Sequence, residues 1–304
     1  MRIRVLGSGA GGGFPQWNCN CPNCDGVRRG AIPARPRTQS SIGLSADGVT
    51  WVLVNASPDV RAQLAAFPPM QPGRAVRDTA ICGIVLIDSQ IDHTTGLLML
   101  REGGPLHIYC TGPVHEDLTT GNPLLRVLAH YCGTTWHPIP LAGDGAFTIE
   151  GAESLRFTAI PLTSKAPPYS PHRHHSHPGD TIGLHVEDPA TGGVLFYAPG
   201  LGEIGERVRR LMVESDCVMV DGTFWTEDEM ARLGIADRRA RELGHIPQSG
   251  PGGMLEILAP LGRPRKILIH INNTNPILNE ASPERRQLAA AGIEASWDGM
   301  DITL

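Results

Sequence analysis

The residues best suited to chemistry in this chain follow a short apolar run in its first third. The run Ile84 to Ile87 consists of branched apolar residues, which is typical of a buried strand. Asp88, Gln90, Asp92 and His93 come directly after it. A carboxylate and an imidazole side by side at a strand end suit one divalent metal ion. We therefore expect Asp92 and His93 to be metal ligands.

Three residues of the second half are candidate partners for this pair. Asp221 and His270 each end an apolar strand, and His245 stands in a loop before an expected helix. A single histidine at a strand end is usually a core residue whose hydrogen bonds are satisfied. The prediction of a metal site therefore depends on three apolar strands that each end in Asp or His. We expect Asp92, His93 and His270 to share a metal. Asp221 is expected to be a ligand or a group beside the ligands, and the role of His245 stays open.

A cysteine cluster near the N-terminus indicates a second metal site. Cys19, Cys21 and Cys24 supply three thiols within six residues, and tetrahedral zinc takes three cysteines and one further ligand well. Free cysteines in such a loop would be vulnerable to oxidation. We predict structural zinc, with Asn273, His270 or water as the fourth ligand.

A glycine-rich stretch, residues 7–13, has the spacing of a dinucleotide-binding fingerprint. That fingerprint needs a helix to begin at the glycines, whereas Phe14, Pro15 and the cysteines follow here. We expect instead a tight turn that lets the backbone approach the neighbouring active site.

Four histidines lie between Pro171 and Pro178. The prolines and polar neighbours favour an exposed loop over a metal site. A less favoured hypothesis is a flexible lid, residues 172–177, that contacts an acidic or aromatic substrate.

The composition is that of a soluble globular enzyme: 41% of the 304 residues are hydrophobic, 19% are charged, and the net charge is −5. No run of Lys or Arg suggests nucleic acid, and no apolar stretch approaches the ~20 residues of a membrane span. The first residues alternate like a strand and show no signal peptide, so we expect a cytoplasmic protein. Seven cysteines, three of them clustered, favour metal binding over disulfides.

Strands and helices are mixed, and strands often follow one another without a helix between them, which favours two packed sheets with helices outside. Strands are expected at 3–7, 41–45, 51–55, 84–88, 106–109, 155–160, 181–186, 193–197, 217–221, 266–270 and 301–304. Helices are expected at 58–66, 94–101, 122–129, 203–213, 226–233, 253–261 and 282–291, with Ser57 and Ser282 as caps. We expect one domain over 1–304, with the cysteine-rich zinc loop at about 14–30.

Three segments together resemble the B proteins of pyrroloquinoline quinone (PQQ) biosynthesis. They are LGSGAGGGFPQWNCNC (residues 6–21), DSQIDHTTG (88–96) and HINNTNPI (270–277). More distantly, the chain is similar to metallo-β-lactamase-fold phosphodiesterases, whose motif is His-x-His-x-Asp-His. The resemblance implies a four-layer αββα sandwich, the α/β metallo-β-lactamase fold, with the metal site at one edge of the sheets.

The resemblance also implies that one of the two metal sites of those phosphodiesterases is lost. Asp88 and Gln90 replace the two leading histidines, whereas the second site maps to Asp92, His93, Asp221 and His270.

Two further positions depart from the phosphodiesterase pattern. Asn273 stands where those relatives have a histidine zinc ligand, and Ser164 falls near their mid-chain histidine. Together with Asp88 and Gln90, Ser164 is expected to contact substrate.

The resemblance implies a role in building PQQ from a peptide-derived, glutamate–tyrosine cross-linked precursor, alongside other PQQ biosynthesis proteins. Two histidines and a carboxylate with open positions are what a non-haem Fe(II) oxygenase uses for O2 and substrate. We therefore predict iron-dependent hydroxylation of the tyrosine-derived ring, with His245 as an acid–base or positioning group.

Two alternatives remain open: a mononuclear metal-dependent hydrolase, and a carrier that moves PQQ or its precursor to the periplasm. These ligands would also bind zinc, manganese or copper.

Overall fold

Short runs of Val, Ile and Leu form most strands of the computed structural model, which describes residues 1–304. They build two seven-stranded sheets. The first sheet runs, in spatial order, β14 (Asp301–Thr303), β1 (Arg2–Gly7), β2 (Ser41–Ser45), β3 (Trp51–Val54), β4 (Ile81–Val85), β5 (Leu106–Cys110) and β6 (Thr134–Pro138). The second runs β13 (Ile293–Ala295), β12 (Arg265–Ile269), β11 (Cys217–Asp221), β10 (Gly193–Ala198), β9 (Ile182–Asp188), β8 (Arg156–Pro161) and β7 (Ala146–Phe147).

Both sheets follow the same plan of pairing. In the first, β14 to β3 pair antiparallel and β3 to β6 pair parallel. In the second, β7 to β10 pair antiparallel and β10 to β13 pair parallel. Parallel strands end at the same edge of a sheet, so residues that follow β4, β11 and β12 are brought to common edges.

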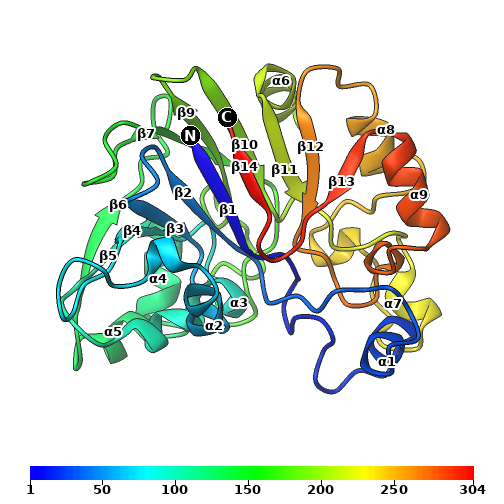
Figure 1. Cartoon of the computed structure of the whole chain (residues 1–304), viewed down its shortest axis with the longest axis horizontal. Coiled ribbons are helices and arrows are strands. Elements are labelled where there is room, and N and C mark those ends of the chain that lie inside the picture. The colour runs from blue at the N-terminus through cyan, green and yellow to red at the C-terminus, as the bar shows by residue number, and fades with distance from the viewer.

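Helices cover the outer face of each sheet (Figure 1). The helices are α1 (Pro22–Arg28), α2 (Val60–Ala65), α3 (Ile91–Thr94), α4 (Gly112–Thr119), α5 (Leu124–Leu128), α6 (Glu206–Glu214), α7 (Glu229–Arg232), α8 (Met254–Leu258) and α9 (Pro283–Ala290). Residues of α2, α4 and α5 pack on the first sheet, and residues of α6, α8 and α9 pack on the second. The predicted αββα sandwich is therefore confirmed.

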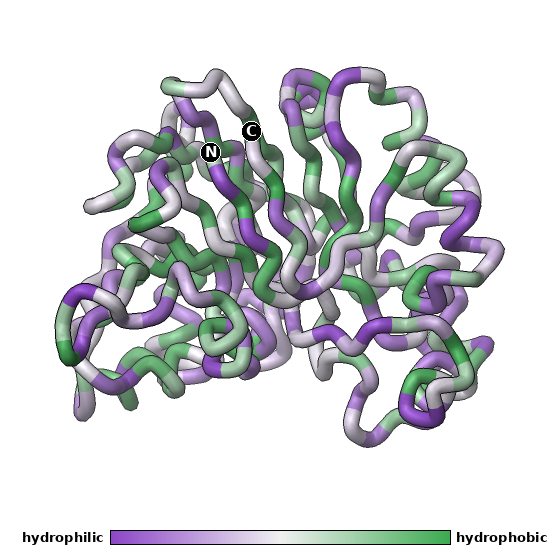
Figure 2. The backbone as a smooth tube through the Cα atoms, in the orientation of Figure 1, coloured by the Kyte–Doolittle hydropathy of each residue, from purple (hydrophilic) through white to green (hydrophobic).

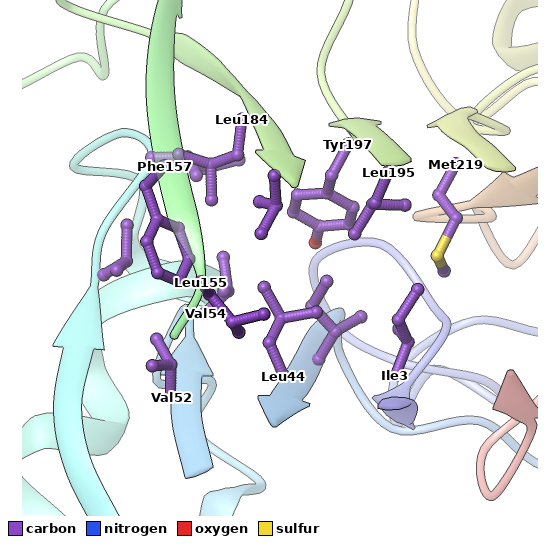
Figure 3. Close-up of a cluster of buried hydrophobic side chains, with 14 of the residues drawn as sticks. Ile3, Leu44, Val52, Val54, Leu155, Phe157, Leu184, Leu195, Tyr197 and Met219 are labelled. Carbon is purple, nitrogen blue, oxygen red and sulfur yellow. The ribbon is translucent and has the colours of Figure 1, made fainter. Parts of the chain in front are cut away.

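The largest apolar cluster fills the space between the two sheets. In Figure 3, Ile3, Leu44 and Val54 from the first sheet face Leu195 and Tyr197 from the second. Figure 2 shows hydrophobic residues running along these central strands. Because side chains alternate along a strand, the other face of each sheet is left for the helices.

Several predicted elements differ from the structure. Strands β6, β7 and β13 and helices α1 and α4 were not expected. The helix expected at 94–101 is α3 followed by a 3-10 helix at Thr95–Leu100. The helix expected from Pro58 begins at Val60, with Asp59 and not Ser57 at its N-cap, although the Ser57 hydroxyl accepts a hydrogen bond from Asp59 N just before the helix.

The prediction of a cap at Ser282 is confirmed, since its hydroxyl accepts a hydrogen bond from Arg285 N. The expected glycine turn also forms without a helix after it. Gly11 lies so close to Asp92 that a Cβ there would stand 3.3 Å from the carboxylate.

The histidine loop is only partly exposed. His174, His175 and His177 face solvent as expected, but the expectation is wrong for His172, which is buried. The ring of His172 bonds Asp180 through Nδ1 at 2.9 Å, which holds it inside.

Replacing Leu44 by Ala tests the packing between the sheets. Leu44 is fully buried there, so the cavity left behind should lower the free energy of unfolding by about 3 kcal/mol. Urea denaturation measures it, with the fully exposed Val76→Ala as the control. Equal unfolding midpoints for the two variants would contradict this packing.

Candidate metal centre

The candidate ligands Asp92, His93 and His270 come together at the edge between the sheets. Asp92 and His93 lie on α3, which follows β4, and His270 follows β12. One ligand atom from each residue lies within 4.8 Å of the other two. His270 Nε2 is 3.2 Å from Asp92 Oδ2, and His93 Nε2 is 3.9 Å from the same oxygen. Two imidazoles and a carboxylate at this spacing fit one divalent cation.

Asp88 fixes the orientation of the His93 ring by a contact with its Nδ1 atom. Its Oδ1 lies 2.8 Å from His93 Nδ1, and both residues are buried. A carboxylate on Nδ1 fixes the proton there and leaves Nε2 as the metal-binding nitrogen. Ser40 Oγ is 3.1 Å from this Nε2. Asp88, which was expected to contact substrate, lies against the candidate ligand His93 and also lines the cavity beside it.

The charges of the trio are strongly coupled. Burial acts to lower the pKa of His93, but Asp88 and Asp92 outweigh it and raise the pKa to about 9. Burial acts to raise the pKa of Asp92, but His93 and His270 hold it below its usual range. The carboxylate is thus kept ionised beside a protonated ring, and a cation would take the place of that proton.

A second cluster joins Asp221, Thr223, His245 and His270. Asp221 Oδ2 lies 2.6 Å from His245 Nδ1 and also accepts from Leu201 N. Asp221 Oδ1 accepts from Thr223 N and from the Thr223 hydroxyl at 2.6 Å. That hydroxyl lies 3.0 Å from His270 Nδ1.

Asp221 therefore faces His245 and the Thr223 hydroxyl. One of its ligand atoms lies within 4.8 Å of those of His245 and His270, a group distinct from the trio with Asp92. Both carboxylate oxygens are engaged by N–H or O–H donors. This geometry suits a group that orients His245 and His270.

A cavity of about 310 Å³ opens on the trio. All three expected substrate-contacting residues, Asp88, Gln90 and Ser164, line it, as does His245. The Gln90 amide donates to the Lys165 carbonyl at 3.2 Å. Only three of the 18 lining residues are hydrophobic, so the cavity suits a polar ligand.

The cysteine loop forms a separate cluster. The sulfurs of Cys19, Cys21 and Cys24 lie within 4.8 Å of one another. The Asn273 amide nitrogen is 3.1, 3.7 and 3.4 Å from them in that order. Exchanging the nitrogen and oxygen positions of this amide would place its oxygen close to the same three sulfurs. Both ring nitrogens of His270 are engaged in the other cluster, so Asn273 is the better placed fourth ligand.

Three residues of the site were not predicted from the sequence, and a fourth, Arg173, was included only as part of the hypothetical lid at 172–177. Ser40 and Thr223 are single hydroxyls, which occur throughout the chain. Lys165 and Arg173 line the cavity from the segment between β8 and β9. Thr223 alone had a hint, because it stands two residues after the strand-ending Asp221.

Comparison with known proteins places the chain in a family. A model described as "Beta-lactamase superfamily domain" matches residues 50–271. Coenzyme PQQ synthesis protein B of Nitrosococcus oceani is 65% identical over 310 residues, and that of Methylobacillus flagellatus is 63% identical over 305, each match covering both chains fully. The chain belongs to the coenzyme PQQ synthesis protein B family.

Solved structures agree with this family assignment. Zinc-bound PqqB from Methylobacterium extorquens is 34% identical, covers all of both chains and has a TM-score of 0.89. A diphosphatase of the PhnP family, 19% identical with a TM-score of 0.66, shares the fold. None of the helices combines the length and the apolar character that a membrane span requires.

Replacing Asp88 by Ala should weaken metal binding by about 10- to 100-fold, because His93 loses the partner that orients it. Metal titration of the purified variant measures this change. Gln90→Ala is the control, since the Gln90 side chain bonds only the Lys165 carbonyl and its loss should leave metal affinity unchanged. Equal affinities in all three proteins would show that Asp88 does not support the ligand.

Glu229 is a buried acid near the cavity wall. It accepts hydrogen bonds from Trp225 N and from the Thr274 hydroxyl, and the same hydroxyl accepts from Asn272, which lines the cavity. Burial raises the pKa of Glu229 to about 7, against an ordinary value of 4.5. The folded protein therefore holds this proton over a range in which the unfolded chain has lost it.

This proton makes stability depend on pH. The contribution is full below about pH 4.5 and is lost as pH rises through about 7, with a size on the order of 3 kcal/mol. Glu229→Gln should remove that decline from the curve of unfolding free energy against pH. The exposed Glu203→Gln serves as the control. Parallel curves for Glu229→Gln and the unaltered protein would contradict a raised pKa.

Proposed function

We propose that this protein acts in PQQ biosynthesis as an iron-dependent enzyme that uses O2 to hydroxylate the tyrosine-derived ring of a cross-linked precursor. The observation that carries the proposal is the trio Asp92, His93 and His270 on the wall of a polar cavity. A bound Fe(II) with this ligand set would supply O2 activation. The family name supports the pathway, and the ligand set supports the type of reaction.

The reaction balances with a two-electron reductant. One oxygen atom of O2 enters the ring as a hydroxyl group. The other leaves as water, with two electrons from the reductant and two protons. Either an external reductant or a catechol-like part of the substrate would serve.

The residues around the trio have separate tasks in this proposal. Asp88 and Thr223 hold His93 and His270 through their Nδ1 atoms, so that Nε2 of each ring faces Asp92. Rings fixed in this way would hold a bound ion at the wall of the cavity, where substrate could reach it.

His245 is proposed as the acid–base group. Its Nδ1 faces Asp221 and Thr223, which leaves Nε2 for a proton of the substrate. Because Asp221 is completely buried and accepts four hydrogen bonds, the orientation of His245 is fixed before substrate binds.

The first two positions of the motif weigh against two-metal hydrolysis. Asp88 is engaged with His93, and Gln90 is turned to the Lys165 carbonyl. Neither completes a second ligand set beside Asp92. We propose that Gln90 and Ser164 contact the substrate from the cavity wall, and that Cys19, Cys21 and Cys24 hold structural zinc with Asn273.

Replacing His93 by Ala should abolish iron uptake and oxygen consumption together, because a ligand is removed. His130→Ala is the matched control, since that histidine is exposed on the first sheet's side. Precursor is incubated with iron-loaded protein and reductant, with and without air, and analysed by mass spectrometry. Oxygen-dependent gain of one oxygen atom is expected. Oxygen-independent cleavage would indicate a hydrolase, binding without product a carrier, and hydroxylation by metal-free protein would overturn the ligand assignment.

A further inference from the structure

The segment between β8 and β9 forms one wall of the cavity over the candidate metal centre. Ser164, Lys165, Pro168 and Arg173 line the cavity from this segment. The exposed histidines of the same segment take no part in the trio of ligands. The two cationic side chains of the segment, Lys165 and Arg173, suggest a different role for it.

Hydrogen bonds to neighbouring elements fix this wall in place. Gln90 donates to the Lys165 carbonyl, and the Tyr169 hydroxyl donates to the Ser89 carbonyl. His172, the residue before Arg173 in the chain, is buried, and its ring is hydrogen-bonded to Asp180. The position of the Arg173 backbone is thus set by a buried ion pair next to it. This wall is an anchored part of the fold.

Lys165 and Arg173 are the only lysine or arginine residues that line the cavity. No carboxylate oxygen lies within 4.0 Å of a side-chain nitrogen of either residue. The arginines that do have such a partner lie mostly on the outer surface. Arg173 donates through one nitrogen to the Ala166 carbonyl, and Lys165 donates to the Glu242 carbonyl. Each cation retains N–H donors for a ligand.

The acids of the cavity do not neutralise these cations. Asp88 is bonded to His93, and Asp92 lies against His93 and His270. A divalent cation at the trio would add further positive charge. The wall with Lys165 and Arg173 therefore favours an anion that lies over the metal ligands.

We propose that Lys165 and Arg173 bind carboxylate groups of the substrate, so that the site accepts an aromatic ring that carries at least two carboxylates. The inference rests on the proposed function for the ring, and adds how that ring is recognised. Arg173 presents a planar fork that matches a carboxylate, and Lys165 acts as a second point charge. Two fixed anchors on one wall would orient the ring against the metal centre.

Binding of PQQ itself tests this recognition without turnover. PQQ is an aromatic carboxylate, and its trimethyl ester has the same ring without the charges. Titrations use the full-length protein loaded with zinc, which has no redox chemistry. The variants are Arg173→Gln, Lys165→Gln and both together, with Arg173→Lys for partial rescue. Arg126→Gln is the control, because it removes one exposed positive charge on α5.

Each single Gln variant should bind PQQ about tenfold more weakly, and the double variant about 100-fold, which corresponds to one charge-assisted hydrogen bond per anchor. Added salt should weaken PQQ binding to the unaltered protein and leave the double variant little changed. The ester should bind all proteins equally. Zinc content should stay the same, which separates a lost anchor from a damaged metal site.

Unchanged PQQ affinity in the double variant, or equal binding of ester and acid, would overturn the inference. Displacement of PQQ by an equal concentration of inorganic phosphate would assign the cations to a phosphoryl group and overturn it as well. Failure of hydroxylation with intact charge-dependent binding would remove the oxygenase proposal alone, because this assay involves no chemistry.

Discussion

His270 Nε2 lies 3.2 Å from Asp92 Oδ2, and this distance depends on how the two sheets are held relative to each other. Asp92 follows β4 of the first sheet, and His270 follows β12 of the second. The two sheets are separate, but isolated backbone bridges between Gly9 and Ile271 and between Asp88 and Thr181 link them beside the site, so these bridges and the side-chain packing together set the distance. Close-packed interiors resist small displacements, and the apolar layer of Figure 3 therefore acts as the support of the ligand set.

Hydrogen bonds on the Nδ1 atoms refine what the packing provides. Asp88 fixes the His93 ring and Thr223 fixes the His270 ring, each from the side away from Asp92. An aspartate at position 88 thus has a use other than metal ligation, because it sets the tautomer of the neighbouring ligand. In the proposed one-metal site, Asp88 thus supports the neighbouring candidate ligand His93.

The Asp or His residues that follow apolar runs were the signal that predicted which candidate ligands would meet, although the strands β4 and β12 belong to different sheets. The sequence predicted Asp92, His93 and His270 as neighbours, and the four-layer fold with them. It could not predict which way Asp88 and Asp221 would turn, because the partner of Asp88, His93, is brought to it by the local backbone at α3, and the partner of Asp221, His245, comes from another segment.

Elements with weak apolar patterns were missed for a related reason. Strand β6 (Thr134–Pro138) is a polar edge strand that ends in proline, and β13 has only three residues. Burial of His172 was also unpredictable, because its partner Asp180 is separated from it by a stretch that reads as exposed loop. Local composition describes such segments, whereas tertiary contacts decide their burial.

The turn after β12 connects the two candidate metal clusters. His270 begins it with φ of 60°, a left-handed conformation that costs a non-glycine residue energy unless its surroundings hold it. Asn273, three residues later, lies against the three cysteine sulfurs. Asn23, from the cysteine loop, donates to the carbonyls of Asn273 and Asn275. The cysteine loop therefore holds the backbone that carries His270, so the order of this loop supports the geometry of a candidate ligand that it does not touch.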